Sequence, residues 1–194
     1  MKDEQKFITD HADTLLRIVN QDRHDWLNHL QVLHAYLKLG RYQDGEDYLQ
    51  KVTEEAHRES MIARINCSRL SAFFLTFNAL NRDIIVEVEV KTQVDVTKLE
   101  MQSDSFFYLI STCIGLLQHH LHKEQVEHPH LAVTLFHSDN EVFANFDLEG
   151  QVSALVAGEV EKLIHDHKGM AKLVSEQIHT DTGWIAEMSF PCKM

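Results

Sequence analysis

The sequence predicts an α+β protein in which a hairpin of two long helices precedes a layer of strands and helices. Three observations support this fold class. Apolar residues recur at helical spacing through the first third of the chain. The remaining two thirds of the chain alternates between helical and strand-like patterns. The full chain contains only 2 proline and 7 glycine residues, which are the residues that most often interrupt helices and strands. We assign the helical hairpin to residues 1–66 and the α/β part to residues 67–194.

A long amphipathic helix is the first predicted element. Its apolar stripe recurs at steps of three, four or seven residues: Leu15, Val19, Trp26, Leu30, Leu33 and Leu37. Gly40, in the segment KLGRY, is expected to end this helix in the left-handed conformation. A second helix should then run from about Tyr42 to about Ile65, with heptad-like apolar spacing. The short turn between two long helices predicts an antiparallel hairpin.

A hairpin of only two helices cannot bury the apolar faces of both. We therefore expect two copies of the chain to pair their hairpins into a dimeric four-helix bundle. The protein would then be a homodimer. In that arrangement the apolar stripe faces the bundle core, and the opposite side of the first helix faces water.

The second part of the chain is expected to place helices on one face of a mixed sheet. Helices are predicted over 70–80, 103–123 and 151 to about 177, the last interrupted near HDHKGM. Strands are predicted over 84–90, 130–150 and 183–191, the middle segment being a hairpin that turns at Ser138-Asp139-Asn140. We assign the large aromatic side chains to the core: Trp184, Phe73, Phe74 and Phe77.

Composition argues against several functions. The net charge of −12 at pH 7 disfavours binding to nucleic-acid phosphates and to anionic membranes. No apolar run approaches the roughly 20 residues of a membrane span, and the segment MKDEQKFITDHADTLLR is too polar for a signal peptide. Cys67, Cys113 and Cys192 are widely spaced, which is typical of reduced thiols, and Cys113 should be buried. We therefore expect a cytoplasmic protein without nucleic-acid or membrane partners.

The segment RHDWLNHLQ, Arg23–Gln31, carries the main chemical candidates. On a helix His24, Leu27, Asn28 and Gln31 share one face, because positions three, four and seven apart align. This face is turned away from the apolar stripe, so the His24 side chain should project into water. An exposed imidazole is largely neutral at pH 7, and its free nitrogen is a nucleophile. The same pattern also fits an ordinary solvated helix face.

The two neighbours of His24 are charged. Arg23 could neutralise charge on an incoming phosphoryl group. Asp25 could orient the other imidazole nitrogen through a hydrogen bond. Adjacent residues on a helix do not naturally face one another, however, so the role of Asp25 stays open.

This box resembles the Arg-His-Asp-aromatic-x-Asn-x-Leu-Gln phosphoacceptor box of the sporulation initiation phosphotransferase B family. Citrate- and fumarate-type sensor histidine kinases carry a similar box. The segment YLKLGRYQDGEDYLQKV continues the likeness into the helical hairpin, and the order of elements extends it over nearly the whole chain. The resemblance implies that His24 is phosphorylated on nitrogen. It also implies that the chain passes a phosphoryl group between aspartates of two response-regulator receiver domains, in the initiation of sporulation.

The receiver domains should dock on the outer face of the first helix. Leu27, Asn28 and Gln31 are the residues that we expect them to contact around His24. An apolar side chain among polar neighbours suits a weak and transient interface. The Mg²⁺ that such transfers require is expected in the acidic pocket of the receiver, and this chain is expected to bind no cofactor and no metal.

The α/β part resembles a histidine-kinase ATPase domain that has lost nucleotide binding. In kinases an Asn-rich helix holds Mg²⁺, and an Asp-x-Gly-x-Gly loop and a Gly-rich lid hold the nucleotide. The corresponding helix here, SFFYLISTCIGLLQHHLHK, contains no Asn. The segment FDLEGQV keeps Asp147 and Gly150 without the paired glycines, and only Gly169 remains of the lid glycines. The expected fold is therefore a degenerate ATPase-like α/β sandwich, since the backbone and carboxamide ligands are missing.

Two histidine-rich segments could suggest a metal site. His119 with His122, or His128 with His130, could chelate, but no fixed acid or Cys completes a tetrahedral set. The same holds for HDH at 165–167. Two other functions stay open from sequence: a soluble sensor-type histidine kinase with a divergent ATP site, and a non-catalytic dimeric interaction module in which His24 is incidental.

Overall fold

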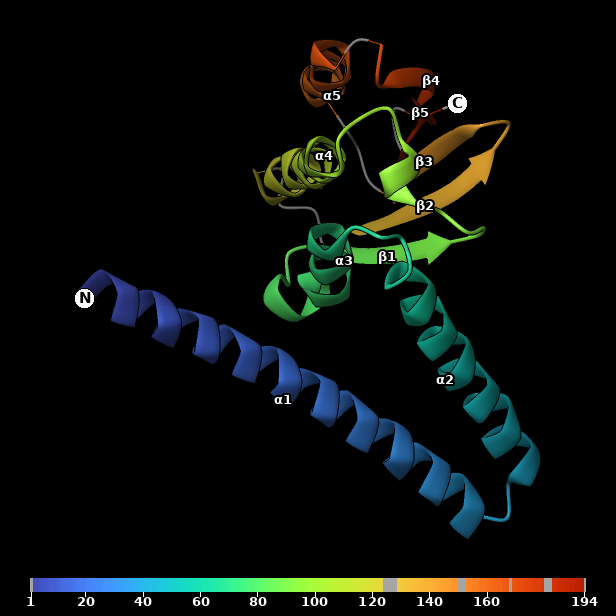
Figure 1. Cartoon of the computed structure of the whole chain (residues 1–194). Helices are drawn as coiled ribbons and strands as arrows, with labels where there is room; N and C mark the ends of the chain where they lie inside the picture. Colours follow the sequence, from blue (N-terminus) through green and yellow to red (C-terminus); the bar gives the residue numbers. More distant parts are fainter. Residues whose placement is uncertain (1, 124–128, 150–152, 168, 180–182, 194) are drawn as a thin grey trace. The chain divides into compact units, whose positions relative to one another are not determined.

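The computed structural model describes residues 2–123, 129–149, 153–167, 169–179 and 183–193. They form two compact units, Met1–His57 and Arg58–Met194. The first unit contains most of a helical hairpin, and the second contains the last residues of that hairpin and a mixed sheet with helices (Figure 1). The predicted α+β class is thereby confirmed.

The hairpin consists of α1, Lys2–Lys38, and α2, Tyr42–Ile62, and the second helix ends a few residues earlier than predicted. Gly40 has φ +68°, and its N–H donates to the carbonyl of Leu37 at 3.2 Å. The next N–H, of Arg41, donates to the carbonyl of Tyr36 at 3.0 Å. These two bonds form a Schellman motif, so the predicted helix end at Gly40 is confirmed.

Polar and aromatic side chains join the two helices near this turn. A Cβ placed on Gly45 would lie 3.5 Å from Cβ of Tyr36, which shows how closely the helices approach there. Tyr48 packs its ring against Tyr36, with 6.1 Å between ring centroids, and its hydroxyl lies 2.9 Å from Nδ1 of His29. Large apolar side chains of the hairpin are nevertheless exposed: Leu15, Leu16, Val19, Trp26, Leu27, Leu30, Leu37, Leu39, Tyr42 and Leu49.

The second unit contains a five-stranded sheet of order β1-β2-β3-β5-β4. Its strands are β1 Ile85–Val90, β2 His130–Ser138, β3 Glu141–Glu149, β4 Lys172–His179 and β5 Gly183–Pro191. β1 runs parallel to β2, and the other neighbours are antiparallel. Asp139 and Asn140 join β2 to β3 with φ of +47° and +66°, as a type I′ turn requires, so the predicted hairpin is confirmed.

Helices cover one face of this sheet (Figure 1). They are α3 Ser68–Leu80, α4 Ser103–Lys123 and α5 Ala154–Asp166, and a 3-10 turn spans Val96–Lys98. The core between helices and sheet includes the fully buried Trp184, Phe106, Phe146 and Phe190. The predicted core residues Phe74 and Phe77 are buried, whereas Phe73 packs against the core only partly buried.

All three cysteines are buried and free, as predicted for Cys113. Burial raises the pKa of the Cys113 thiol to about 12, because a thiolate in apolar surroundings loses its hydration. This side chain is therefore an inert part of the core.

The free edge of β1 is covered by one side chain of α3. The Asn78 carboxamide accepts from the N–H of Val86 at 2.9 Å and donates to the carbonyl of Val86 at 2.8 Å. It thus takes the place of a neighbouring strand at this residue. Such covering limits pairing with other chains.

The prediction of helix up to about residue 177 was wrong for its second half. α5 ends at Asp166, and KLVSEQIH forms the edge strand β4, paired with β5 from Lys172↔Ser189 to His179↔Gly183. The indole N–H of Trp184 also donates to the Glu176 carboxylate at 2.8 Å. The local composition of KLVSEQIH is compatible with a helix, and hydrogen bonding to β5 makes the segment a strand.

Candidate functional site

The six predicted site residues all lie on α1 and are all exposed: Arg23, His24, Asp25, Leu27, Asn28 and Gln31. The helix continues unbroken through them, because apolar positions before and after the box keep the same period. The His24 side chain is 69% exposed, so solvent and large partners can reach its ring.

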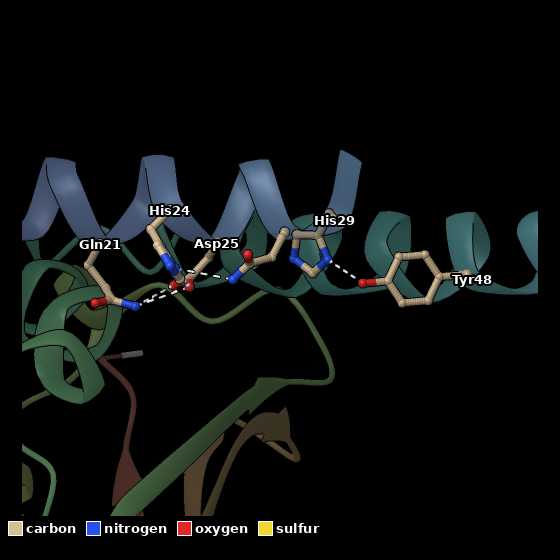
Figure 2. A network of polar contacts seen from close by, with 6 residues as sticks. Gln21, His24, Asp25, His29 and Tyr48 are labelled. Atoms are coloured by element: carbon tan, nitrogen blue, oxygen red, sulfur yellow. Dashed lines mark hydrogen bonds and ion pairs between the residues drawn. The ribbon is translucent and has the colours of Figure 1, made fainter. Parts of the chain in front are cut away.

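Two side chains approach the same nitrogen of His24 (Figure 2). The Asn28 amide nitrogen Nδ2 lies 3.1 Å from Nδ1 of His24, one helical turn further on. Oδ1 of Asp25 lies 3.5 Å from the same Nδ1. The structure therefore brings together three of the predicted residues, and both contacts are made to Nδ1 of the exposed ring.

The carboxylate of Asp25 is itself held by a residue that the sequence interpretation missed. The amide nitrogen Nε2 of Gln21 lies 3.0 Å from both carboxylate oxygens of Asp25. Gln21 stands four residues before Asp25, and the i,i+4 rule for helices could have indicated this pair.

Arg23 and His29 are turned away from His24. The Arg23 guanidinium donates to Oδ1 of Asn20 at 3.1 Å, so it lies toward the preceding turn. His29 is half-buried between the helices, where it bonds Tyr48 and meets the edge of the Trp26 ring. The box thus has an outer face around His24 and an inner face within the hairpin.

The histidine-rich segments show ordinary structural contacts. Nε2 of the buried His120 accepts from the N–H of Ser153 at 3.3 Å, and Nε2 of His130 lies 3.4 Å from the Glu87 carboxylate. His128 lies outside the described residues. Within the described residues, no group of three or more His, Cys, Asp or Glu side chains could hold a metal ion.

Two further features concern membranes and ligands. In the part of the chain that the structure describes, no helix is both long enough and apolar enough to cross a bilayer. A shallow cavity of about 580 Å³ lies between α5 and β4 and is lined by Gly158, Lys162, His165 and Leu173, among others. It includes none of the residues of the His24 box.

The two parts of the chain match two family models. Residues 4–65 match the family model described as "Sensor_kinase_SpoOB-type, alpha-helical domain". Residues 66–191 match "Sporulation initiation phospho-transferase B, C-terminal". The chain therefore belongs to the sporulation initiation phosphotransferase B family, a family of phosphotransferases of the sporulation phosphorelay.

Individual proteins are also similar to this chain. The chain is 24% identical over 151 residues to sporulation initiation phosphotransferase B of Bacillus subtilis (strain 168). The aligned region covers 77% of this chain and 78% of that protein. Among solved structures it is similar to the histidine kinase AdeS of Acinetobacter baumannii, with TM-score 0.46 and 9% identity over 88% of this chain and 98% of that one. The histidine kinase domain of the E. coli osmosensor EnvZ gives TM-score 0.42 and 9% identity over 70% and 86%.

Proposed function

We propose that the chain passes a phosphoryl group from the aspartyl phosphate of one receiver domain to the aspartate of another, through a phosphohistidine at His24. The observation that carries this proposal is the arrangement on α1. The His24 side chain is exposed, and its Nδ1 faces Asn28 and Asp25, on a helix within the matched family domain. We further propose that residues 1–66 form the dimerisation and phosphoacceptor domain and residues 67–194 the α/β domain.

The Asp25 carboxylate beside Nδ1 favours the tautomer that such a nucleophile needs. A carboxylate only accepts hydrogen bonds, so Asp25 favours a proton on Nδ1 and a free electron pair on Nε2. The Asn28 amide nitrogen, 3.1 Å from Nδ1, can only donate, so this contact as it stands calls for a lone pair on Nδ1 and competes with Asp25. Rotation of the carboxamide by half a turn would place its oxygen there and remove the competition. Asp25 is therefore the neighbour that supports attack from Nε2.

The transfer consumes no reagent besides the aspartyl phosphate of the donor receiver. Nε2 forms a bond to phosphorus while the P–O bond of the acyl phosphate breaks, and the electron pair leaves with the receiver's carboxylate. The ring then carries a positive charge and keeps the proton on Nδ1, where the Asp25 carboxylate offsets the charge. Attack on phosphorus by the second receiver's aspartate breaks the N–P bond and returns the pair to Nε2.

The outer face of α1 is the proposed docking surface. Leu27, half exposed, supplies apolar contact beside the polar Asn28 and Gln31, which suits a transient complex. Arg23, held at Asn20, would reach the phosphoryl group only after its guanidinium leaves that contact. The Mg²⁺ would be bound by the receiver, with no cofactor on this chain.

The proposal includes a homodimer in the cytoplasm. Trp26 and Leu30 are 48% and 56% exposed in the single chain, and pairing of two hairpins would cover this stripe. The net charge of −12 disfavours nucleic-acid and anionic-membrane partners. A monomer in light scattering would contradict the four-helix bundle.

The test is a transfer assay from a phosphorylated receiver domain, with wild type, His24→Gln and His34→Gln. His34 is also an exposed histidine of α1, so it is a matched control. We expect His24→Gln to reduce transfer on the order of 10³-fold or more, because the nucleophile is removed, and His34→Gln to transfer normally. Transfer that survives in His24→Gln would contradict the proposal. Incorporation of label from ATP alone would instead favour a kinase, and receiver binding without transfer would favour an interaction module.

A further inference from the structure

We infer that Gln21 is a positioning residue for phosphoryl transfer at His24 and acts through Asp25. The inference rests on the proposed role of His24 and adds to it a residue outside the recognised box. Figure 2 shows Gln21, His24 and Asp25 in this order along α1, with the Gln21 amide directed at the Asp25 carboxylate.

The geometry is a clamp on a carboxylate. Nε2 of Gln21 lies 3.0 Å from Oδ1 and 3.0 Å from Oδ2 of Asp25, so one of its N–H groups is shared by both oxygens. Oδ1 is also the oxygen that lies 3.5 Å from Nδ1 of His24. One carboxylate therefore links the amide of Gln21 to the imidazole.

Asp25 needs such a clamp because of its position. Adjacent helical residues point in different directions, so the Asp25 side chain has to bend around the helix to reach His24. It is also about half exposed, and water would compete for its oxygens in other rotamers. Charge-assisted bonds from Gln21 select the rotamer in which the negative charge lies beside Nδ1.

This rotamer matters at the moment when charge develops. Phosphorylation of Nε2 makes the His24 ring cationic, with the proton kept on Nδ1. A carboxylate already held beside Nδ1 stabilises that cation without reorganising. Gln21 touches neither the phosphoryl group nor the ring, so its effect on the transfer is indirect.

The chain offers a matched control for the same bond. Gln43 donates to Oδ1 of Asp47 at 3.0 Å, again at i,i+4 on an exposed helix face. The neighbours of Asp47 are Glu46 and Tyr48, so no histidine stands next to this carboxylate. Loss of the bond there should leave the transfer chemistry unchanged.

The experiment compares Gln21→Met, Gln21→Arg and Gln43→Met in the full-length chain, with His24→Gln as the reference. Glutamine, methionine and arginine have similar helix propensities, and circular dichroism checks that α1 is retained. Phosphoramidate serves as a small phosphodonor that needs no docking, and a phosphorylated receiver domain serves as the protein donor. Nitrogen-15 NMR of the unphosphorylated protein reports the His24 tautomer.

We expect Gln21→Met to lower the rate of His24 phosphorylation by about fivefold with both donors, the size of effect that one hydrogen bond supports. The loss should fall on kcat rather than KM, and the population with the proton on Nδ1 should decrease. Gln21→Arg, which keeps a planar donor, should restore the rate and the tautomer. Gln43→Met should match wild type.

Other outcomes overturn the inference in distinguishable ways. If Gln21→Met keeps the wild-type rate and tautomer while His24→Gln is inactive, Gln21 has no positioning role and the proposed function stands. A raised KM for the receiver alone, with phosphoramidate unaffected, would make Gln21 a docking contact instead. Persistent phosphorylation of His24→Gln would remove the proposed function itself.

Discussion

The two units of the chain bury their apolar residues to different degrees. In Arg58–Met194, large side chains such as Trp184 and Phe146 are fully buried within the unit. In Met1–His57, Trp26, Leu30 and Leu37 remain about half exposed. The sandwich therefore closes its own core, whereas the hairpin leaves a stripe of large apolar side chains exposed in the single chain. Under the proposed dimer, the stability of the unit that carries His24 should depend on assembly.

The two tryptophans allow each unit to be followed separately. Trp184 lies in the core of the sandwich, and Trp26 lies on the exposed stripe of α1. In a Trp26→Phe background, fluorescence reports the sandwich, and in a Trp184→Phe background it reports the hairpin.

The largest effect on stability is expected for Phe146→Ala. Phe146 is fully buried on the inner face of β3, so truncation should lower the free energy of unfolding of the sandwich by about 3–5 kcal/mol. Urea unfolding followed by Trp184 fluorescence measures it, and the midpoint should not depend on protein concentration. Phe143→Ala, which removes a half-buried ring stacked on Phe136 on the other face, should cost about 1 kcal/mol. Equal losses for the two variants would contradict a one-sided core.

A smaller and concentration-dependent effect is expected for Leu30→Ala. If a second hairpin covers Leu30, truncation should destabilise the dimer by about 2 kcal/mol. The measurement is thermal unfolding followed by Trp26 fluorescence over a range of protein concentrations. Leu39→Ala, 70% exposed at the turn, is the control and should be near neutral. Equal behaviour of the two variants would mean that this stripe faces water in solution.

The smallest effect is expected for Tyr48→Phe. This change removes the hydroxyl that lies 2.9 Å from Nδ1 of His29 and should cost about 1 kcal/mol. The same Trp26 assay measures it, and Tyr42→Phe, at an exposed tyrosine near the turn, serves as the control. No loss relative to that control would show that the aromatic packing alone joins the two helices.

Much of the fold could be predicted because its signals are local. The left-handed Gly40, the positive φ of Asp139 and Asn140, and the strict alternation in β1 are each set by a few neighbouring residues. The strand β4 could not be predicted in this way, because its pairing partner β5 supplies the hydrogen bonds that decide its state. Gly183 is another such case, since a Cβ there would lie 2.7 Å from the carbonyl oxygen of Leu148 on the neighbouring strand.

For the site around His24, too, some features follow from the sequence and others only from the folded structure. By itself the sequence determined that His24, Leu27, Asn28 and Gln31 share one face of a helix, because helical periodicity is a property of the local chain. Only the tertiary structure decided which side chains turn inward, such as His29 toward Tyr48. The i,i+4 spacing of Gln21 with Asp25 and of His24 with Asn28 makes both contacts possible, and the side-chain rotamers of the folded helix decide that they form.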